Sequence, residues 1–508
     1  MRNRKIFLSL LFIFLFCENV SSYAHSEITI EEGLNDIYNV RLDDAENKFR
    51  SYQVQYPDDI KGYFYESMIY FYKAGTTRDE NYYGKYLELT NNVIEKCENA
   101  LDKNDSDVDA LFYKGAAHSY RSLIMLMLNK SLLKAADNGN DGYRILKKIT
   151  QKYPDYYDAY MGLGLFKIAI SFIPEKFQWL LSLIGIEGGL KDGLEMLRTA
   201  SEKAKFNKID AKVFLAVFLI HEKEELNTEP LNILKNLVND FPESPAIRML
   251  YGGFLVQICR VDDGVKQFEI ALNLNKFSLQ KELNKGIYSF LGTAYFRKND
   301  FNKAALNLEE SFKYMLDEDR YNLTMNLLGI SYEMIGRRDL AIEKYKAARD
   351  KYIEERDGEA EKLYLRYSLE RMKTAINELD SLMIIAINEK ETGDYDKSLN
   401  TFNEIAENKW LEKYTNDDLR IRYYYELGIL YTFRKENDKA IECFNKSIKI
   451  NPPGELWLIP HSYFELGKIY YRAGNKEMGD KMFDKVFEYK DYDFRNFLEM
   501  RVRNFLDK

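Results

Sequence analysis

Histidine is scarce in this chain, which limits the metal and acid–base chemistry that the sequence can support. The 508 residues include four histidines: His25, His118, His221 and His461. His221 opens the run HEKEEL, which lacks the second histidine that a zinc protease helix requires. His118 and His461 lie within apolar helical patterns, where we expect them to pack against neighbouring helices. The sequence therefore predicts no zinc site.

The run DNGNDG at residues 137–142 has part of the pattern of a calcium-binding loop. Asp137, Asp141 and Gly142 stand at suitable positions. However, Gly139 occupies a ligand position, and Lys148 stands where a bidentate glutamate is required. We therefore interpret this run as a turn that caps the following helix.

Fingerprints of catalysis are also missing from the sequence. It contains no G-x-S-x-G motif, no P-loop and no dinucleotide-binding fingerprint. The Asp and Glu residues are spread along the chain as on solvated helix faces, so they do not indicate an acid–base pair. We therefore predict no catalytic residue, no metal and no cofactor, and a protein that is not an enzyme.

The charge of the chain indicates which partners are disfavoured, and its cysteines indicate whether disulfides are expected. The chain has 73 Lys and Arg against 81 Asp and Glu, a net charge of −8, and the two signs are interspersed. Without a basic stripe to displace counterions from phosphates, a nucleic-acid partner is disfavoured. Cys97, Cys259 and Cys443 are widely spaced within apolar helical patterns. We expect them to be small buried side chains rather than parts of a disulfide framework.

Residues 1–24 have the pattern of a secretory signal peptide. The positive start MRNRK precedes a short apolar run and the small residues Ser22 and Ala24. The apolar run IFLSLLFIFLF is too short to span a bilayer, which needs about 20 residues. We therefore expect cleavage after Ala24 and an exported protein, in the periplasm or cell envelope of a bacterium.

A repeated pattern organises the C-terminal half of the chain. Residues 288–312, 325–348, 424–452 and 463–487 share an aromatic residue or Met, a Leu-Gly pair, a Tyr, a polar turn, and a small residue followed by an aromatic residue or Leu. The first three apolar positions, at i, i+3 and i+7, lie on one face of a helix, and the glycine lets a second helix approach closely. The pattern resembles the tetratricopeptide repeat (TPR), a helix–turn–helix hairpin that stacks on its neighbours.

Degenerate copies extend this array toward the N-terminus. Residues 40–57, 141–154, 230–242 and 261–275 each match the second helix of a repeat. We predict an all-α solenoid of about eleven stacked hairpins with a long concave surface. Its expected parts are a degenerate array with insertions over residues 25–275 and a C-terminal array over residues 276–508, which includes an extra helix near 355–381 and a capping helix at 491–508.

An apolar insertion, ISFIPEKFQWLLSLIGIEGG at residues 170–189, interrupts one repeat. Pro174 suits the first turn of a short helix and Gly185 suits its end. Three interpretations stay open: a helix that plugs the solenoid, a groove for a peptide or acyl chain, and a shallow membrane contact. The apolar arc of this helix is wider than the stripe of an ordinary surface helix, and its residues are Phe177, Trp179, Leu180, Leu181, Leu183 and Ile184.

The region around the insertion carries a second resemblance. Gly164, Ser171, Pro174 and the run GIEGGLKDGL at 185–194 are similar to the signature of the inclusion-body-clearance, or tetratricopeptide repeat protein 39, family. The similarity covers about residues 155–275, although the Phe and the Asp-Arg pair of the signature are replaced. It implies the local fold of that family. Because the family consists of intracellular eukaryotic proteins, the export signal argues against extending their role to this chain.

These features indicate a binding protein. We predict an exported scaffold that holds an extended peptide or another protein along the concave face. The alternative is a peripheral protein that contacts lipid through residues 172–184. Residues of the first helices that point away from the hairpin contact would line the concave face: Arg422, Tyr425, Phe433, Phe464, Lys468, Tyr471 and Arg472.

Overall fold

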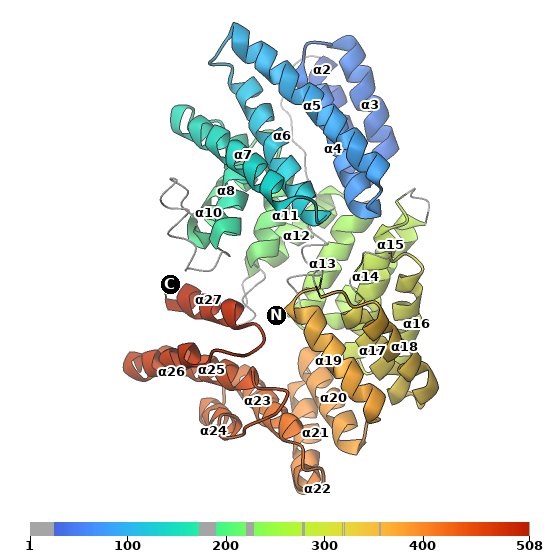
Figure 1. The fold of residues 1–508 in the computed structure, drawn as a ribbon, viewed down its shortest axis with the longest axis vertical. Coiled ribbons are helices and arrows are strands. Elements are labelled where there is room, and N and C mark those ends of the chain that lie inside the picture. Colours follow the sequence, from blue (N-terminus) through green and yellow to red (C-terminus); the bar gives the residue numbers. More distant parts are fainter. Residues whose placement is uncertain are drawn as a thin grey trace. The chain divides into compact units, whose positions relative to one another are not determined.

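The computed structural model describes residues 25–171, 189–219, 228–276, 280–316, 319, 321–354 and 357–506. These residues form 25 helices, α2–α8 and α10–α27, and no strand (Figure 1). The predicted all-α class is therefore confirmed. Several predictions fall outside the described residues: the signal peptide at 1–24, His221, and the insertion residues Phe177, Trp179, Leu180, Leu181, Leu183 and Ile184.

The chain divides into two compact units. The N-terminal unit comprises residues 3–254 and 266–287, and the C-terminal unit comprises residues 255–265 and 288–508. The border between them passes within three helices, α13 (Pro245–Gln257), α14 (Val261–Asn275) and α15 (Leu283–Arg297). The described residues contain eleven consecutive helix pairs, from α2/α3 to α25/α26, as the repeat period predicted.

Five helix pairs precede α13 in the N-terminal unit. In each pair the two helices contact each other: α2 with α3, α4 with α5, α6 with α7, α8 with α10, and α11 with α12. Their bounds are α2 (His25–Tyr38), α3 (Leu42–Gln55), α4 (Ile60–Thr77), α5 (Glu80–Lys103), α6 (Val108–Met127), α7 (Leu132–Lys152), α8 (Asp158–Ser171), α10 (Leu190–Lys203), α11 (Lys208–Leu219) and α12 (Thr228–Asp240).

Aspartates begin three helices of this unit. Asp59, Asp79 and Asp107 each accept a hydrogen bond from a backbone N–H in the first turn of α4, α5 and α6. Such a cap satisfies one of the N–H groups that the start of a helix leaves without a partner, and it stabilises the helix by about 1 kcal/mol. The polar turns of the sequence thus fix where these helices begin.

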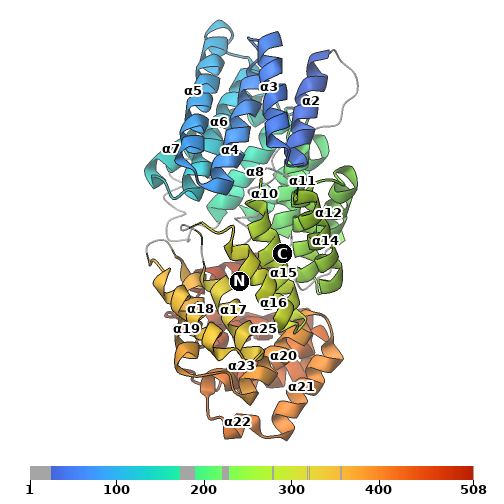
Figure 2. The same cartoon turned by 90° about the vertical axis from the view of Figure 1, so that its right-hand side faces the viewer.

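The first hairpin of the N-terminal unit also contacts α11 and the segment before α13, so the array closes on itself (Figure 2). The Tyr38 hydroxyl donates to Oδ2 of Asp210 on α11 at 3.2 Å, and Ser244 Oγ donates to the Tyr38 carbonyl at 2.5 Å. The rings of Tyr38 and Phe241 meet edge to face, with centroids 4.9 Å apart. Large side chains of the first helices, such as Phe64 and Phe214, are consequently buried.

This closure corrects the prediction of a long open concave surface for residues 25–275. A solenoid whose units contact mainly their sequence neighbours leaves its inner face free. Here residues 172 and 206 positions apart in the sequence bond to each other, and the inner face becomes core. No residue of a single repeat predicts this, because the path of the array depends on small rotations summed over several hairpins.

The run DNGNDG is not a turn. Residues 137–142 lie inside the continuous helix α7, and its two glycines face α6. A Cβ atom on Gly142 would lie 3.0 Å from the Gly115 carbonyl oxygen, and one on Gly139 would lie 3.0 Å from Ser122 Oγ. These glycines therefore serve close helix packing, and the expected helix cap at this position was wrong.

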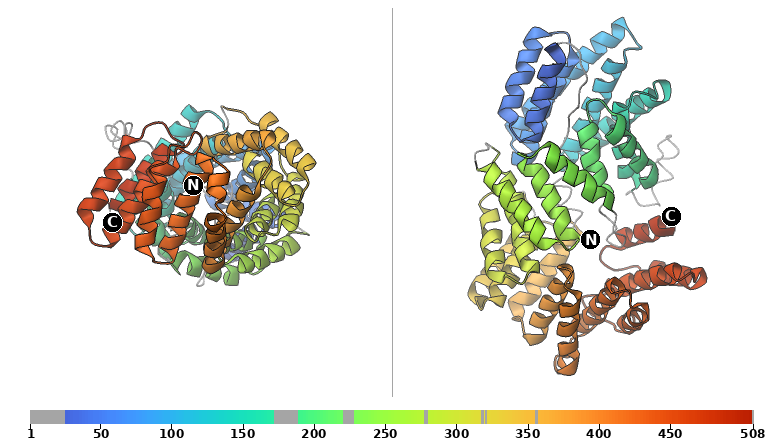
Figure 3. Two further views of the ribbon diagram at one scale, coloured as in Figure 1. Left: turned by 90° about the horizontal axis from the view of Figure 1, so that it is seen from below. Right: turned by 180° about the vertical axis from the view of Figure 1, so that it is seen from behind.

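The C-terminal unit continues the array, and the colours of Figure 3 show its hairpins following one another in chain order. An extra helix, α19, lies within the range 355–381 where the sequence predicted one, and α27 follows the last hairpin as a capping helix. The bounds are α16 (Phe301–Phe312), α17 (Asn322–Met334), α18 (Arg338–Asp350), α19 (Glu359–Lys373), α20 (Glu378–Glu391), α21 (Tyr395–Glu407), α22 (Trp410–Lys413), α23 (Asp417–Phe433), α24 (Asn437–Ser447), α25 (Leu458–Arg472), α26 (Lys476–Glu488) and α27 (Arg495–Leu506).

Each glycine of the repeat signature faces a large side chain on the second helix of its hairpin. A Cβ atom on the glycine would lie 2.5–2.7 Å from a carbon of that side chain, closer than carbon atoms approach. The pairs are all sixteen residues apart: Gly292 with Leu308, Gly329 with Tyr345, Gly428 with Phe444, and Gly467 with Phe483. The predicted role of the glycine in close helix approach is confirmed.

Cys97, Cys259 and Cys443, the cysteines of the described residues, form no disulfide with one another. Cys97 and Cys443 are buried, as predicted, whereas Cys259 is half-buried in the turn after α13. Burial raises the pKa of the Cys97 thiol to about 12 and that of Cys443 to about 11, so both thiols are protonated and unreactive. None of the described helices has the length and apolarity needed to cross a bilayer.

Candidate functional site

Charged side chains line the inner faces of consecutive first helices in the C-terminal unit. They lie on α20, α23 and α25 and in the turn before α25. On α23, positions 422 and 426 share a face at i and i+4, and on α25 positions 461, 465 and 468 share a face at i, i+4 and i+7. We call this set the charged layer: Lys390, Arg422, Glu426, Glu455, Glu465 and Lys468.

Arg422 forms the centre of the charged layer. Its Nη2 donates to Oε2 of Glu455 and to the Tyr367 hydroxyl, both at 2.6 Å. The Arg422 side chain is 25% exposed, whereas the Glu455 side chain is 6% exposed. Burial disfavours the charge of Arg422, but Glu455 and Tyr367 outweigh it and raise the pKa of the guanidinium further above its ordinary value. Arg422 is therefore a fixed cation that water can still reach.

Glu455 is held in position by its own set of hydrogen bonds. Trp457 Nε1 donates to Oε2 of Glu455 at 2.9 Å. The backbone N–H groups of Gly454 and Glu455 both donate to Oδ1 of Asp418 at 2.8 Å, which anchors the turn before α25 to the start of α23. The turn therefore orients Glu455 toward Arg422 before any partner binds.

Lys390 joins the charged layer from α20. It is 3% exposed, and its ammonium group pairs with Glu426 of α23 and lies 3.6 Å from Oε1 of Glu391. Arg297, at the end of α15, pairs with Glu391 at 3.4 Å. Burial lowers the pKa of Lys390, but the glutamates outweigh this effect and raise it above its ordinary value. Lys390 is thus charged and shielded from water.

Glu465 and Lys468 extend the charged layer along α25. Their charged groups are 2.6 Å apart, and both side chains are almost fully buried. Burial raises the pKa of Glu465 to about 7, against the opposing charges of Arg501, Arg472 and Lys390. His461, one turn earlier, has a pKa well below its ordinary value because it is buried and near Arg501. His461 is therefore neutral, as its predicted core position requires.

The C-terminal segment covers part of this face. The guanidinium of Arg501 on α27 lies 4.6 Å from the centroid of the Phe464 ring. Leu498 and Val502 of the same helix join Phe464 in one core cluster. Before α27, Asp493 pairs with Arg366 of α19 at 2.9 Å. These contacts leave Phe464 and Lys468 each 2% exposed.

Of the predicted concave-face residues, four enter or border the charged layer. Arg422 and Lys468 belong to it, Tyr425 contacts Trp457 edge to face at 6.3 Å, and Phe464 neighbours Lys468. The prediction that Phe464 and Lys468 line an open surface was wrong, because α27 packs over α25. The capping helix had been predicted, but not the face that it covers.

The other three predicted residues lie elsewhere. Phe433 stacks on Tyr395 of α21, with centroids 5.5 Å apart. Tyr471 does not point away from the hairpin contact as predicted: it packs on Phe483 at 5.5 Å and bonds to Asp480 of α26. Arg472 is exposed at the end of α25. The structure thus divides the predicted set between the charged layer and hairpin packing.

Sequence reasoning missed five residues of this site: Tyr367, Lys390, Glu426, Glu455 and Glu465. One signal was available for the glutamates of the layer, because Glu426 and Glu465 both stand directly before the Leu-Gly pair of their repeats. This position is apolar in the repeats at 288–312 and 325–348. A carboxylate at a position that faces the neighbouring first helix is costly unless it is paired, so it indicates a partner cation.

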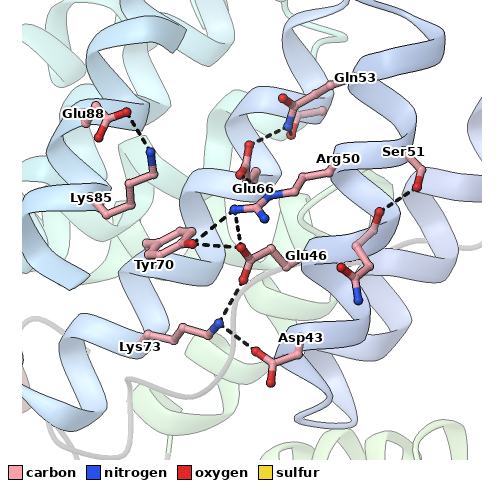
Figure 4. Close-up of polar contacts among 12 residues, drawn as sticks. Asp43, Glu46, Arg50, Ser51, Gln53, Glu66, Tyr70, Lys73, Lys85 and Glu88 are labelled. Atoms are coloured by element: carbon pink, nitrogen blue, oxygen red, sulfur yellow. Dashed lines mark hydrogen bonds and ion pairs between the residues drawn. The ribbon is translucent and has the colours of Figure 1, made fainter. Parts of the chain in front are cut away.

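A second charged network joins α3 to α4 in the N-terminal unit (Figure 4). Glu46 accepts from the Tyr70 hydroxyl at 2.8 Å and pairs with Lys73 at 2.9 Å and Arg50 at 2.6 Å. Asp43 also pairs with Lys73, at 2.8 Å. Asp43 and Glu46 of α3 are matched by Lys73 of α4, and Glu66 of α4 is matched by Arg50 of α3, so we assign the network to the stacking of the first two hairpins.

Neither network has the composition of a metal centre. Among the residues that the structure describes, no cluster of three or more His, Cys, Asp and Glu side chains could hold a metal ion. The charged layer offers guanidinium and ammonium donors beside carboxylate acceptors. Such groups recognise charged and backbone polar groups of a peptide.

Two curated proteins match parts of this chain. A TPR repeat-containing protein of Methanocaldococcus jannaschii is 27% identical over 336 residues, which is 59% of this chain. The photosystem I assembly protein Ycf3 of Rippkaea orientalis is 30% identical over 99 residues, which is 19% of this chain. The matches span 54% of the length of each relative, so about half of each is represented.

Solved structures with some similarity are also helical repeat proteins. Yeast Tom70 aligns over 92% of this chain and 99% of its own, with 12% identity and a TM-score of 0.33. A tetratricopeptide repeat protein from Parabacteroides merdae aligns over 60% of this chain and 98% of its own, with 12% identity and a TM-score of 0.30.

Family models match three parts of the chain. Two tetratricopeptide repeat models match residues 421–452 and 460–492, which cover most of α23/α24 and α25/α26 and include four members of the charged layer. The model of the Iml2/Tetratricopeptide repeat protein 39 family matches residues 64–321, just over half of the chain, and includes the segment in which the sequence resembled that family. The chain therefore belongs to the Iml2/Tetratricopeptide repeat protein 39 family.

Proposed function

We propose that this protein is an exported, non-catalytic binding protein of the cell envelope, which holds an extended peptide or a segment of another protein against the charged layer. Tetratricopeptide repeats mediate protein–protein and peptide interactions, and two such repeats contain Arg422, Glu426, Glu465 and Lys468. The signal-peptide pattern of residues 1–24 supports the exported location.

The observation that carries this proposal is that Arg422 is charged, held by two hydrogen bonds and partly exposed. Both of its hydrogen bonds, to Glu455 and Tyr367, use Nη2, and the described residues make no hydrogen bond with its Nε or Nη1. A guanidinium has five N–H donors in a fixed plane that matches a carboxylate or a pair of carbonyl groups. Arg422 is thus oriented, charged and one-quarter exposed, with donors left for a ligand.

Stability alone does not explain so many charges on this face. A buried ion pair gains little over a well-packed apolar pair, because both charges lose their hydration. Lys390, Glu426, Glu455, Glu465 and Lys468 are nevertheless drawn from several elements to one face. A binding role accounts for them, since the paired carboxylates hold the cations in place while part of Arg422 stays accessible.

Substitution of Arg422 by lysine tests the proposal. The purified protein is used to capture partners from the envelope fraction, and the dissociation constant of the strongest captured partner is then measured. Arg422→Lys keeps the charge but loses the planar set of donors, so we expect binding to weaken about tenfold or more. The matched control is Arg420→Lys on the same helix, where the exposed Arg420 pairs with Asp417 at 3.0 Å.

Comparison of Arg422→Lys with Arg420→Lys distinguishes a loss of partner binding from a perturbed fold. Circular dichroism melting of both variants shows whether either one perturbs the fold. We expect Arg420→Lys to bind like the unchanged protein. Equal affinity of Arg422→Lys and the unchanged protein for the partner would remove the charged layer from the proposal.

Lipid contact through residues 172–184 is the alternative function. The apolar arc of that segment motivates it, and the segment lies outside the described residues. Flotation of the protein with phospholipid vesicles tests it: Phe177→Ser/Leu181→Ser should reduce vesicle binding if this segment inserts. An unchanged bound fraction would exclude the alternative.

A further inference from the structure

Three leucines are strongly exposed at the turn between α6 and α7. Leu126 is 49% exposed, Leu132 is 71% exposed and Leu133 is 80% exposed. Their neighbours Ile124 and Ala135 are buried, so both helices are packed in the array while these leucines point away from it. With the two lysines of the same turn they form what we call the leucine tip: Leu126, Lys130, Leu132, Leu133 and Lys134.

Such a group of side chains is unusual for this chain. Large exposed apolar side chains elsewhere in the described chain are scattered, such as Val54 on α3, Leu306 on α16 and Ile353 in the segment after α18. Isolated exposed leucines are common on soluble proteins and need no explanation, whereas a contiguous apolar patch marks a contact. The clustering of three in eight residues therefore indicates that the leucine tip contacts something.

Positive charge predominates along the sequence around the leucine tip, and Asp137, one turn after Leu133 on α7, is the first acid beyond it. Residues 110–136 contain no Asp or Glu, although the whole chain has 81 among 508 residues. Lys134 is exposed, and its ammonium group has no ion-pair partner among the described residues. Lys130 pairs with the exposed Glu80 at 2.5 Å and lies 5.1 Å from the centroid of the Tyr83 ring. Cations and a tyrosine thus border the exposed leucines.

A lipid surface fits this composition better than a protein partner does. A stable protein interface buries about 800 Å² on each partner, which is far more than three leucine side chains provide. Shallow insertion into a bilayer needs only a few apolar side chains, with lysines that reach anionic headgroups and aromatic rings at the interface. A contact made by a few inserted side chains is peripheral.

We propose that the leucine tip attaches this protein to the surface of an anionic phospholipid membrane. The leucines enter the boundary between headgroups and acyl chains, Lys134 contacts a phosphate, and Lys130 contacts one after leaving Glu80. This site belongs to the N-terminal unit and does not depend on the charged layer, so a peptide bound there and a membrane bound here are independent of each other.

Vesicle flotation tests the leucine tip. The purified protein is mixed with vesicles of phosphatidylcholine alone or of phosphatidylcholine with phosphatidylglycerol, and the floated fraction is measured. We expect flotation with the anionic vesicles and at least about tenfold weaker binding for Leu132→Ser/Leu133→Ser, since each exposed leucine loses its apolar contact. Lys134→Glu should reduce the preference for anionic vesicles several-fold.

The matched control is Leu306→Ser on α16, where the leucine is 61% exposed and distant in sequence from the leucine tip. This variant should float like the unchanged protein. Leu132, Leu133, Lys134 and Leu306 are all exposed, so circular dichroism of these variants should show an unchanged fold.

Three results would overturn the proposal. The first is equal flotation of Leu132→Ser/Leu133→Ser and the unchanged protein. The second is loss of flotation in Phe177→Ser/Leu181→Ser alone, which would assign lipid contact to the insertion. The third is a lipid-free oligomer that Leu132→Ser/Leu133→Ser dissociates while the unchanged protein does not float, which would make the leucine tip a contact between copies of this chain.

Discussion

Gly329 on α17 lies directly against Tyr345 on α18. A Cβ atom on Gly329 would stand 2.6 Å from Cζ of the tyrosine ring. The ring cannot move aside easily, because the Tyr345 hydroxyl donates to Oε1 of the buried Glu333 at 3.0 Å. The two helices of this hairpin are therefore as close as a glycine allows, and the same relationship recurs in three other repeats of the C-terminal unit.

Replacing Gly329 by alanine should destabilise this hairpin. Overpacking of a close contact costs about 1–3 kcal/mol, which exceeds the gain in helix propensity. The matched control is Gly84→Ala in α5, because nothing lies within 4 Å of a Cβ at that position. Gly84→Ala should be neutral or stabilising by up to about 1 kcal/mol.

Hydrogen exchange followed by mass spectrometry is the suitable measurement for Gly329→Ala. In a repeat array a local defect spreads mainly to neighbouring units. Exchange should therefore accelerate over residues 325–348 before it does over residues 40–57. Equal effects of the two alanine substitutions would contradict the packing role of Gly329.

Tyr38→Phe should weaken the closure of the N-terminal unit. It removes the hydroxyl that donates to Asp210, and the loss of one buried hydrogen bond costs about 1–2 kcal/mol. We expect faster exchange in both α2 and α11, although they are far apart in sequence. Tyr63→Phe is the control, because the Tyr63 hydroxyl bonds to the Pro57 carbonyl at the surface. Loosening of α2 without α11 would argue against closure through this bond.

Glu465→Gln should change how stability depends on pH. Burial raises the pKa of Glu465 from 4.5 to about 7, so the folded protein binds a proton there that the unfolded chain releases above about pH 4.5. The stability contributed by this proton is present below the unfolded pKa and is lost as pH rises through 7. Relative to Glu465→Gln, the unchanged protein should gain up to about 3 kcal/mol between about pH 8 and pH 5.

Denaturant unfolding of both proteins at several pH values measures this effect. Using the difference between the two proteins removes the contributions of all other titrating groups. A difference in unfolding free energy that stays constant with pH would show that Glu465 does not titrate in this range.

Export predicts a shortened mature protein. Cleavage after Ala24 would leave His25 as the first residue. Intact-mass measurement of the native protein, purified from the envelope fraction of its own cells, determines where the chain begins. A mass that includes residues 1–24 would refute both the cleavage and the signal-peptide interpretation.

The hairpins of the C-terminal unit could be predicted because the residues that form each hairpin lie close together in the sequence. The apolar face of the first helix, the glycine and the facing large side chain all lie within about 20 residues of sequence. In the first hairpin the same relationship holds, since a Cβ on Gly33 would lie 2.6 Å from Cε1 of Phe49. The sequence pattern did not reveal Gly33, because its Leu34 follows the glycine instead of preceding it.

The contacts between different repeats could not be predicted in the same way. Tyr38 meets Asp210, and Arg422 meets Tyr367 and Glu455, only after the helices between them have set the direction of the array. The position of α27 over Phe464 likewise depends on the path of residues 489–494. The sequence therefore indicated which helix faces carry polar side chains, and the structure was needed to show which of these side chains meet.

Site-specific photo-crosslinking from the charged layer tests directly whether a partner segment binds there. A photoreactive benzoylphenylalanine replaces Tyr425, which contacts Trp457 beside the Arg422–Glu455 pair, or replaces the adjacent Tyr424, which packs with the α20–α23 core cluster instead. After illumination in the envelope fraction, crosslinked peptides are identified by mass spectrometry. We expect a crosslink to one partner segment from position 425, lost in Arg422→Lys, and little or none from position 424. Equal crosslinking from both positions, or a crosslink at 425 that Arg422→Lys leaves unchanged, would contradict a binding site at the charged layer.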